Sequence, residues 1–175
     1  MEWQELVASA YEHVLTVLER VLEGLSQEDL DWQPKPDCNS IGWLAWHLTR
    51  QEDATISFMM RENQLWLAEK WHEKFNRPAN PMDFGTGQTI EQAAEFKSPD
   101  VATFLGYQRA VMERAKKFIA TLSPSDMDRV LKVPGFDPPP TVGSWLVSSL
   151  GDALQHAGQA GYVRGLRKGI GWQKA

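Results

Sequence analysis

The sequence predicts an all-α protein, a four-helix bundle with long crossover connections. Four long stretches place apolar residues at helical spacing, and none of the four is interrupted by proline. The segments between the second and third stretches and between the third and fourth are long and irregular. A chain of 175 residues can bury one good core but is too short for two ordinary domains, so we expect one domain over residues 1–175.

Each long helix is indicated by its stripe and its ends. The first should span residues 2–24, and the second should begin at Asn39 or Ser40. The third should open at Ser98-Pro99-Asp100, with a cap followed by proline at the first helical position. The fourth should begin at the Thr141 cap, after three prolines, and reach Arg167.

The connection over residues 66–88 contains turn signals and several aromatic residues. A long loop of this kind in a compact protein is often functional, so we expect it to cover the mouth of a pocket. Its Gly85-Thr86-Gly87 is no phosphate loop, because the Gly-Lys-Ser/Thr ending is missing. Residues 130–140 should form a strand-like or irregular link.

Composition excludes several classes of function. The net charge is −5 with acids and bases interspersed, which suggests neither a nucleic-acid nor an anionic-membrane partner. The lone cysteine, Cys38, excludes an internal disulfide and is better read as a bystander than as a nucleophile. The acidic, directly helical N-terminus is not a signal peptide, and no apolar run has membrane-spanning length. We therefore expect a cytoplasmic protein.

The last predicted helix carries a polar stripe. Asp152 and His156 are four residues apart and project from one helix face, with Gln159 a turn further along and Ser148 a turn before. A carboxylate, an imidazole and an amide on an otherwise apolar or small-residue strip each need a partner. A divalent metal is one such partner; a water-mediated polar network or a solvated helix face is the alternative.

The second predicted helix carries His47 on a stripe with Trp43, Gln51 and Phe58. This imidazole needs a partner too, either a metal or a hydrogen bond in the core. His13, beside the apolar stripe of the first helix, is interpreted as a boundary residue rather than a ligand.

A second strip on the last helix consists of small or apolar residues spaced three and four apart: Gly151, Leu154, Gly158, Gly161 and Gly165. Each glycine costs about 1 kcal/mol of helix propensity, so the strip should permit close approach of another helix. That helix could belong to the bundle or to a second subunit.

The segments Ser40–Leu48, with His47, and Asp152–Gly165, with His156, together resemble the DinB/YfiT-like superfamily, and the resemblance covers nearly the whole chain. It implies a four-helix bundle, often dimeric, with a divalent metal held by three histidines. His47 and His156 match two of them by position, and Asp152 stands where the middle histidine is usual. Two histidines and a carboxylate suit zinc, nickel, iron or manganese. Alternatively the site has lost metal, with Asp152 hydrogen-bonded to a histidine.

Members of the superfamily include S-transferases that use bacillithiol or mycothiol, a mycothiol-dependent maleylpyruvate isomerase and hydrolase-like proteins. The leading hypothesis is therefore a metal-dependent transferase in which His47, Asp152 and His156 hold a metal that activates a low-molecular-weight thiol. Substrate-orienting candidates are Gln51, Ser148 and Gln159, and Arg50 is a candidate partner for the carboxylates of the thiol. The alternatives are a metal-dependent hydrolase and a non-catalytic, dimeric module that binds a metal or small molecule.

Overall fold

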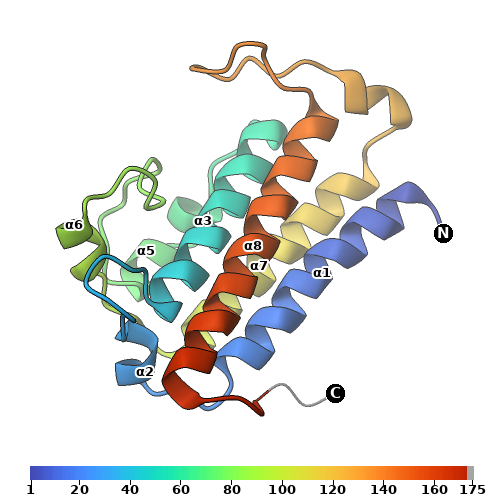
Figure 1. The fold of residues 1–175 in the computed structure, drawn as a ribbon. Helices are drawn as coiled ribbons and strands as arrows, with labels where there is room; N and C mark the ends of the chain where they lie inside the picture. Colours follow the sequence, from blue (N-terminus) through green and yellow to red (C-terminus); the bar gives the residue numbers. More distant parts are fainter. Residues whose placement is uncertain (173–175) are drawn as a thin grey trace.

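A computed structural model describes residues 1–172 of the chain, and residues 173–175 of the predicted domain lie outside the described part. The prediction of an all-α four-helix bundle is confirmed (Figure 1). The four long helices are α1 (Trp3–Leu22), α3 (Ile41–Met60), α7 (Val101–Ala120) and α8 (Val142–Lys168). The short elements are α2 (Gln27–Asp31), α4 (Leu65–Ala68), α5 (Trp71–Lys74), α6 (Ile90–Ala94) and a 3-10 turn, η1 (Pro124–Asp128).

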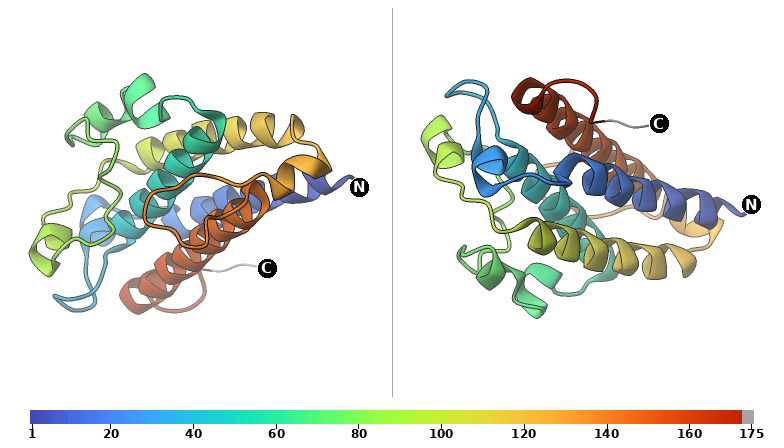
Figure 2. Two further views of the ribbon diagram at one scale, coloured as in Figure 1. Left: turned by 90° about the horizontal axis from the view of Figure 1, so that it is seen from above. Right: turned by 90° about the horizontal axis from the view of Figure 1, so that it is seen from below.

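Each long helix packs against two of the others. α8 packs against α3 and α1, and α7 packs against the same two helices. The views from above and below show this arrangement (Figure 2). α3 and α7 run in the same direction, so the chain between them must return along the bundle through α4, α5 and α6. α8 runs antiparallel to α3, which places the start of α8 beside the end of α3.

Hydroxyl caps set the starts of both helices that carry the polar stripes. The Ser40 hydroxyl accepts a hydrogen bond from the Trp43 backbone N–H, and Thr141 does the same for Ser144. The predicted cap at Ser98 is wrong. Asp100 caps α7 by accepting from the Thr103 N–H at 2.7 Å, because its carboxylate reaches the first turn and also opposes the positive end of the helix.

The predicted link over residues 130–140 is irregular, with one antiparallel bridge between Val130 and Thr141. That bridge is closed by the Val142 N–H, which donates to the Arg129 carbonyl at 3.0 Å. The link therefore returns to the start of α8 and covers that end of the α3–α8 pair (Figure 2).

The strip of small and apolar residues on α8 faces outward over much of its length. A Cβ added at Gly151 or Gly158 would have no atom of the described chain within 4 Å, whereas one at Gly161 would contact Val21 and Trp172. Leu154 beside them is exposed. Close approach within the described chain therefore explains Gly161 but not Gly151 or Gly158.

Arg164, on the same helix, closes the end of α1. Its Nη1 donates to the Val21 carbonyl at 2.6 Å and to the Glu23 carbonyl at 2.7 Å, which are among the groups that a helix terminus leaves without partners. A cation at this position also matches the negative end of the α1 dipole. Its role is structural.

A buried ion pair holds the return segment on α3. Asp53 is completely buried and accepts hydrogen bonds from the backbone N–H groups of Leu65 and Trp66 at 3.0 and 2.8 Å, and from the Tyr107 hydroxyl at 2.7 Å. Its carboxylate lies 3.7 Å from the Arg50 guanidinium. One carboxylate thus joins α3, α4 and α7.

Arg50 completes this arrangement from the other direction. Its guanidinium is buried, lies over the Trp66 ring, and donates to the backbone carbonyls of Pro81 and Asp83 at 3.1 and 3.2 Å. The loop that precedes α6 is therefore tied to α3 through its backbone, so its position does not depend on exposed contacts.

Within residues 1–172, no helix is both long enough and apolar enough to span a lipid bilayer.

We expect Asp53→Asn to lower the free energy of unfolding by about 3 kcal/mol or more, because it leaves the buried Arg50 guanidinium without its charge partner. An amide at this position would also turn N–H donors toward the N–H groups of α4. Urea unfolding followed by circular dichroism measures the loss. Glu62→Gln is the matched control: Glu62 is an exposed partner of Arg114, so its loss should be below about 1 kcal/mol. Equal losses in the two variants would contradict this assignment.

Candidate metal centre

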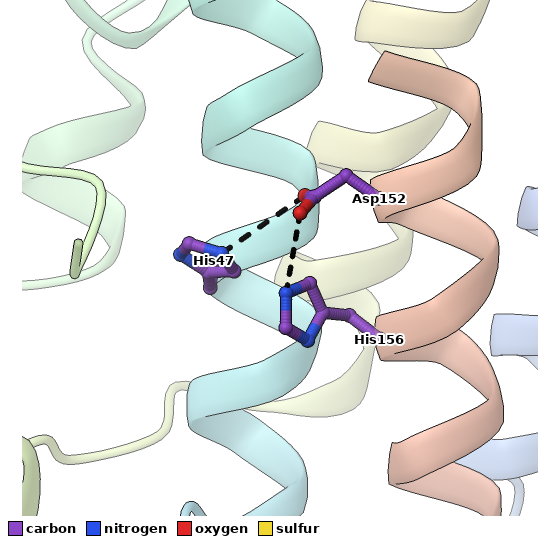
Figure 3. Close-up of side chains that lie close together, drawn as sticks. All are labelled: His47, Asp152 and His156. Atoms are coloured by element: carbon purple, nitrogen blue, oxygen red, sulfur yellow. Dashed lines mark ion pairs between the residues drawn. The ribbon is translucent and has the colours of Figure 1, made fainter. Parts of the chain in front are cut away.

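Three potential metal ligands meet between α3 and α8: His47 from α3, with Asp152 and His156 from α8 (Figure 3). One ligand atom from each residue lies within 4.8 Å of the other two. The Asp152 carboxylate is central, with Oδ2 at 4.0 Å from His47 Nε2 and Oδ1 at 3.4 Å from His156 Nε2. The two imidazoles meet edge to face, with ring centroids 4.6 Å apart.

The spacing along α8 explains half of this arrangement. Asp152 and His156 are separated by one helical turn and therefore project toward the same neighbour, as the sequence predicts. The antiparallel packing of α3 against α8 supplies the other half by bringing His47 to the level of these two side chains.

The His47 ring is held on both sides. Its Nδ1 donates a short hydrogen bond to the Phe84 carbonyl, since a backbone carbonyl can only accept. The ring also stacks on Trp43 at 4.8 Å, and the Trp43 Nε1–H donates to Gln88 at 2.9 Å. His47 Nε2 is consequently the unprotonated nitrogen of the neutral ring, and it faces Asp152.

His156 is arranged in the same way. Its Nδ1 lies 2.7 Å from Gln159 Oε1, an amide oxygen that accepts a hydrogen bond. Both histidines therefore commit Nδ1 to a hydrogen-bond acceptor and direct Nε2 at the central carboxylate. Anchoring of the second ring nitrogen is characteristic of histidines that bind metals.

Gly85 permits the loop to approach His47 this closely. It has a φ of +87°, and a Cβ at this position would lie 2.6 Å from the Trp43 ring. Any larger residue would push the loop outward and move the Phe84 carbonyl away from His47. The sequence identified the Gly85–Gly87 turn without revealing this role.

The donor set fits a divalent cation. Two ligands bound to zinc at about 2.0–2.1 Å in tetrahedral geometry are about 3.4 Å apart. The separation between His156 Nε2 and Asp152 Oδ1 is 3.4 Å, and that between His47 Nε2 and Asp152 Oδ2 is longer, at 4.0 Å. Asp152 Oδ2 is also buried without a hydrogen-bond partner in the described structure. A cation among the three ligand atoms would satisfy this oxygen. Two nitrogens and one oxygen suit zinc, nickel, iron or manganese.

The pKa values of the two histidines are shifted in opposite directions. Burial lowers the pKa of His47, although the Phe84 carbonyl opposes this shift. The hydrogen bond to Asp152 raises the pKa of His156. Burial raises the pKa of the Asp152 carboxyl, but the hydrogen bond and charge of His156 outweigh it and leave that pKa below its usual value. Without metal, His156 and Asp152 form an ion pair beside a neutral His47.

The other predicted site residues have different surroundings. Gln159 lies in the site as the partner of His156, and Gln51 faces the loop and donates to the Thr86 hydroxyl at 3.1 Å. Ser148 is exposed, one turn before Asp152 on α8. Arg50 points into the core and is occupied by Asp53 and by backbone carbonyls, so it does not reach the three ligands. His13, predicted to be a boundary residue, is exposed on α1.

Sequence analysis missed a buried carboxyl next to the site. Glu52 is fully buried and accepts from Gln108 Nε2 at 2.5 Å, while its Oε1 has no partner among the described residues. Burial raises the pKa of Glu52 to about 8, and the charge of Asp152 adds to that shift. The sequence offered one signal, a glutamate in the middle of a predicted helix that is rich in apolar and aromatic residues.

The geometry therefore defines a class of protein: a helical bundle that holds two histidines and one carboxylate between two of its helices. The model of the DinB superfamily matches residues 10–160, and the chain belongs to this superfamily. A crystal structure of a conserved protein from Enterococcus faecalis is similar, with 28% sequence identity and a TM-score of 0.87, covering 97% of this chain and 99% of that one. No curated protein matches the sequence significantly.

In metal-free protein we expect His156 to titrate at higher pH than His47. Its raised pKa means that His156 stabilises the fold fully below the pKa it has when unfolded, and that this contribution is lost as pH rises through the folded pKa. Asp152 acts oppositely: its contribution is present above the unfolded carboxyl pKa and is lost as pH falls through the lowered one. NMR titration of the imidazole resonances measures both histidines.

Asp152→Asn should lower the pKa of His156, because the amide cannot stabilise the imidazolium as the carboxylate does. Asp126→Asn, at a partly exposed carboxylate in η1, is the matched control and should leave the pKa of His156 unchanged. An unchanged His156 titration in Asp152→Asn would contradict the assigned ion pair.

Proposed function

We propose that this protein is a divalent-metal-dependent enzyme of the type that transfers low-molecular-weight thiols. The supporting observation is the convergence of His47, Asp152 and His156, with both Nε2 atoms directed at the carboxylate and one carboxylate oxygen without a hydrogen-bond partner among the described residues. Three protein ligands leave a position for an exogenous ligand, which is typical of catalytic rather than structural sites.

A divalent cation held there would supply a Lewis acid that favours the thiolate over the thiol at neutral pH. The surroundings suit access by a small molecule, since the side chains of Asp152 and His156 are 38% and 20% exposed whereas His47 is buried. The thiolate would then attack an electrophilic carbon, and the new C–S bond would form as the bond from that carbon to its leaving group breaks. The leaving group, with the electron pair of the broken bond, and the proton of the thiol would both depart to solvent through the exposed side of the site.

The protein's own residues would mainly orient the reactants. The Phe84 carbonyl and Gln159 hold the two imidazoles in the tautomer that presents Nε2. Gln51 and Ser148, each about one turn from a ligand, are placed to hydrogen-bond a substrate or a water molecule. Arg50 is left out of this proposal because its guanidinium is buried and already paired.

We further propose that the protein is a homodimer that uses the outward strip on α8. Gly151 and Gly158 leave open space there, and Leu154 and Tyr162 are exposed beside them. A second copy of the same helix could approach closely along this face. Light scattering should give the mass of a dimer for the wild type and of a monomer for Leu154→Glu. Leu6→Glu, at an exposed leucine on α1, should remain dimeric; a monomeric wild type would refute the proposal.

The function is tested with cobalt(II), a spectroscopic substitute for zinc. We expect the wild type to bind close to one cobalt ion per chain and to develop thiolate charge-transfer absorption when a low-molecular-weight thiol is added. His156→Ala and Asp152→Ala should each lose most of the cobalt, because two ligands hold a divalent ion far more weakly than three. Metal content by mass spectrometry and visible absorption provide the two readouts.

His13→Ala, which removes an exposed histidine on α1, is the matched control and should retain cobalt. Wild type that binds cobalt but shows no charge-transfer band with cysteine, bacillithiol or mycothiol would contradict the thiol mechanism and favour a hydrolase. Wild type that takes up no cobalt, zinc, nickel or manganese would contradict the metal site and favour a non-catalytic binding module.

A further inference from the structure

A pocket of about 290 Å³ lies between the second half of α3, the loop that contains Met82 and Phe84, and Trp145 of α8. Gln51, which lines it, lies one turn after His47 on α3. Phe84 also lines it, and the carbonyl of this residue holds the His47 ring. The three ligands do not line the pocket themselves, but Gln51 and Phe84 connect it to the His47 side of the site.

Aromatic side chains form the far end of the pocket. Phe58 near the end of α3 and Trp145 near the start of α8 meet there with centroids 6.3 Å apart and ring planes 22° from parallel. Phe58 remains 43% exposed and Met82, on the loop opposite, 71% exposed. Exposed apolar side chains gathered around a concavity are typical of a ligand site.

The charge of the pocket decides what could enter it. Among the described residues no lysine or arginine lines it, and its one acidic side chain, Glu62, is paired with Arg114 at 2.5 Å. A group rich in carboxylates or phosphates would find no cationic partner there. An uncharged ring would bury apolar surface against Phe58 and Trp145 and gain favourable ring geometry.

The helices also set the distance from the metal ligands. Trp145 precedes Asp152 by seven residues, which is about 10 Å along the axis of α8. A molecule that spans this distance needs a reacting group at one end, a short linker and a ring at the other. Two polar residues of the lining, Gln51 and Thr55, lie on α3 between His47 and Phe58, which is the stretch that the linker would pass.

We infer that this pocket holds the aromatic end of an arylalkyl electrophile whose reacting carbon lies beside His47, Asp152 and His156. This inference rests on the proposed function and assigns the substrate class of the same site. The polar thiol would approach from the open side next to His156, because the apolar pocket offers it no charge partner.

The test compares hydroxamates, which bind metal ions through their head group, on zinc-loaded protein by titration calorimetry. We expect 4-phenylbutyrohydroxamate to bind at least about tenfold more tightly than acetohydroxamate, because its ring enters the pocket. Hexanohydroxamate, with a flexible alkyl chain, should fall between them. Equal affinity for the phenyl and acetyl compounds would overturn the inference.

Two variants change the pocket in opposite ways. Phe58→Ala removes one aromatic wall, and Ala54→Leu fills the space without removing any contact. Both should remove most of the phenyl advantage and leave acetohydroxamate binding unchanged. Val147→Ala, at a strongly exposed position on α8 outside the pocket, is the matched control and should keep the advantage. A phenyl advantage that survives Ala54→Leu would place the ring elsewhere and overturn the assignment.

Metal-free protein separates this inference from the proposed function. Saturation-transfer NMR with 4-phenyl-1-butanol should detect binding to wild type and its loss in Ala54→Leu. If hydroxamates fail to bind zinc-loaded protein but the alcohol behaves as expected, the aromatic site stands and the metal proposal falls. If the alcohol does not bind wild type, or binds Ala54→Leu equally well, the aromatic site falls.

Discussion

The buried contact between Arg50 and Asp53 is the constraint on which the rest of the structure depends. Two charges removed from water are tolerated only when their hydrogen-bonding capacity is used, and here most of the partners come from α4, from α7 and from the loop before α6. Asp53 accepts hydrogen bonds from α4 and α7, and Arg50 donates hydrogen bonds to the loop before α6. The long return between α3 and α7 is thereby held against the bundle.

This constraint reaches the candidate metal centre through the loop backbone. Asp83, whose carbonyl accepts from Arg50, directly precedes Phe84, whose carbonyl accepts from His47. Gly85 follows, and its positive φ lets the chain turn against Trp43. A buried pair on α3 therefore positions the acceptor that selects the tautomer of a histidine less than one turn away on the same helix.

The groove between α3 and α8 combines two environments because the helices are antiparallel. At its middle, one carboxylate and two Nε2 atoms converge where His47 is buried and Asp152 is half-buried. Toward the start of α8, Phe58 and Trp145 form the aromatic end of a pocket that lies between α3 and the loops. A polar reacting centre next to an apolar recess is the usual composition of small-molecule sites, in which few polar groups fix orientation and apolar walls supply affinity.

The sequence predicts well whatever depends on neighbours within a few residues. Helical periodicity gave the four long helices, and hydroxyl residues gave the starts of α3 and α8. The start of α7 was misplaced by two residues because Ser98 and Asp100 are both good caps and only the folded geometry selects between them. The interval of four residues between Asp152 and His156 is likewise enough to predict that the two side chains are neighbours on one face of the helix.

Contacts between distant segments were decided only by the tertiary structure. A backbone carbonyl such as that of Phe84 has no residue type to identify it, and the direction of the Arg50 side chain depends on where Pro81 and Asp83 lie after folding. The outward direction of Gly151 and Gly158 depends on which face of α8 its neighbours cover. By itself the sequence determined the helices, their polar stripes and three ligand candidates, because helical spacing is a local property. Tertiary packing decided which side chains meet, since hydrogen-bond partners and buried faces are assigned only when distant segments come together.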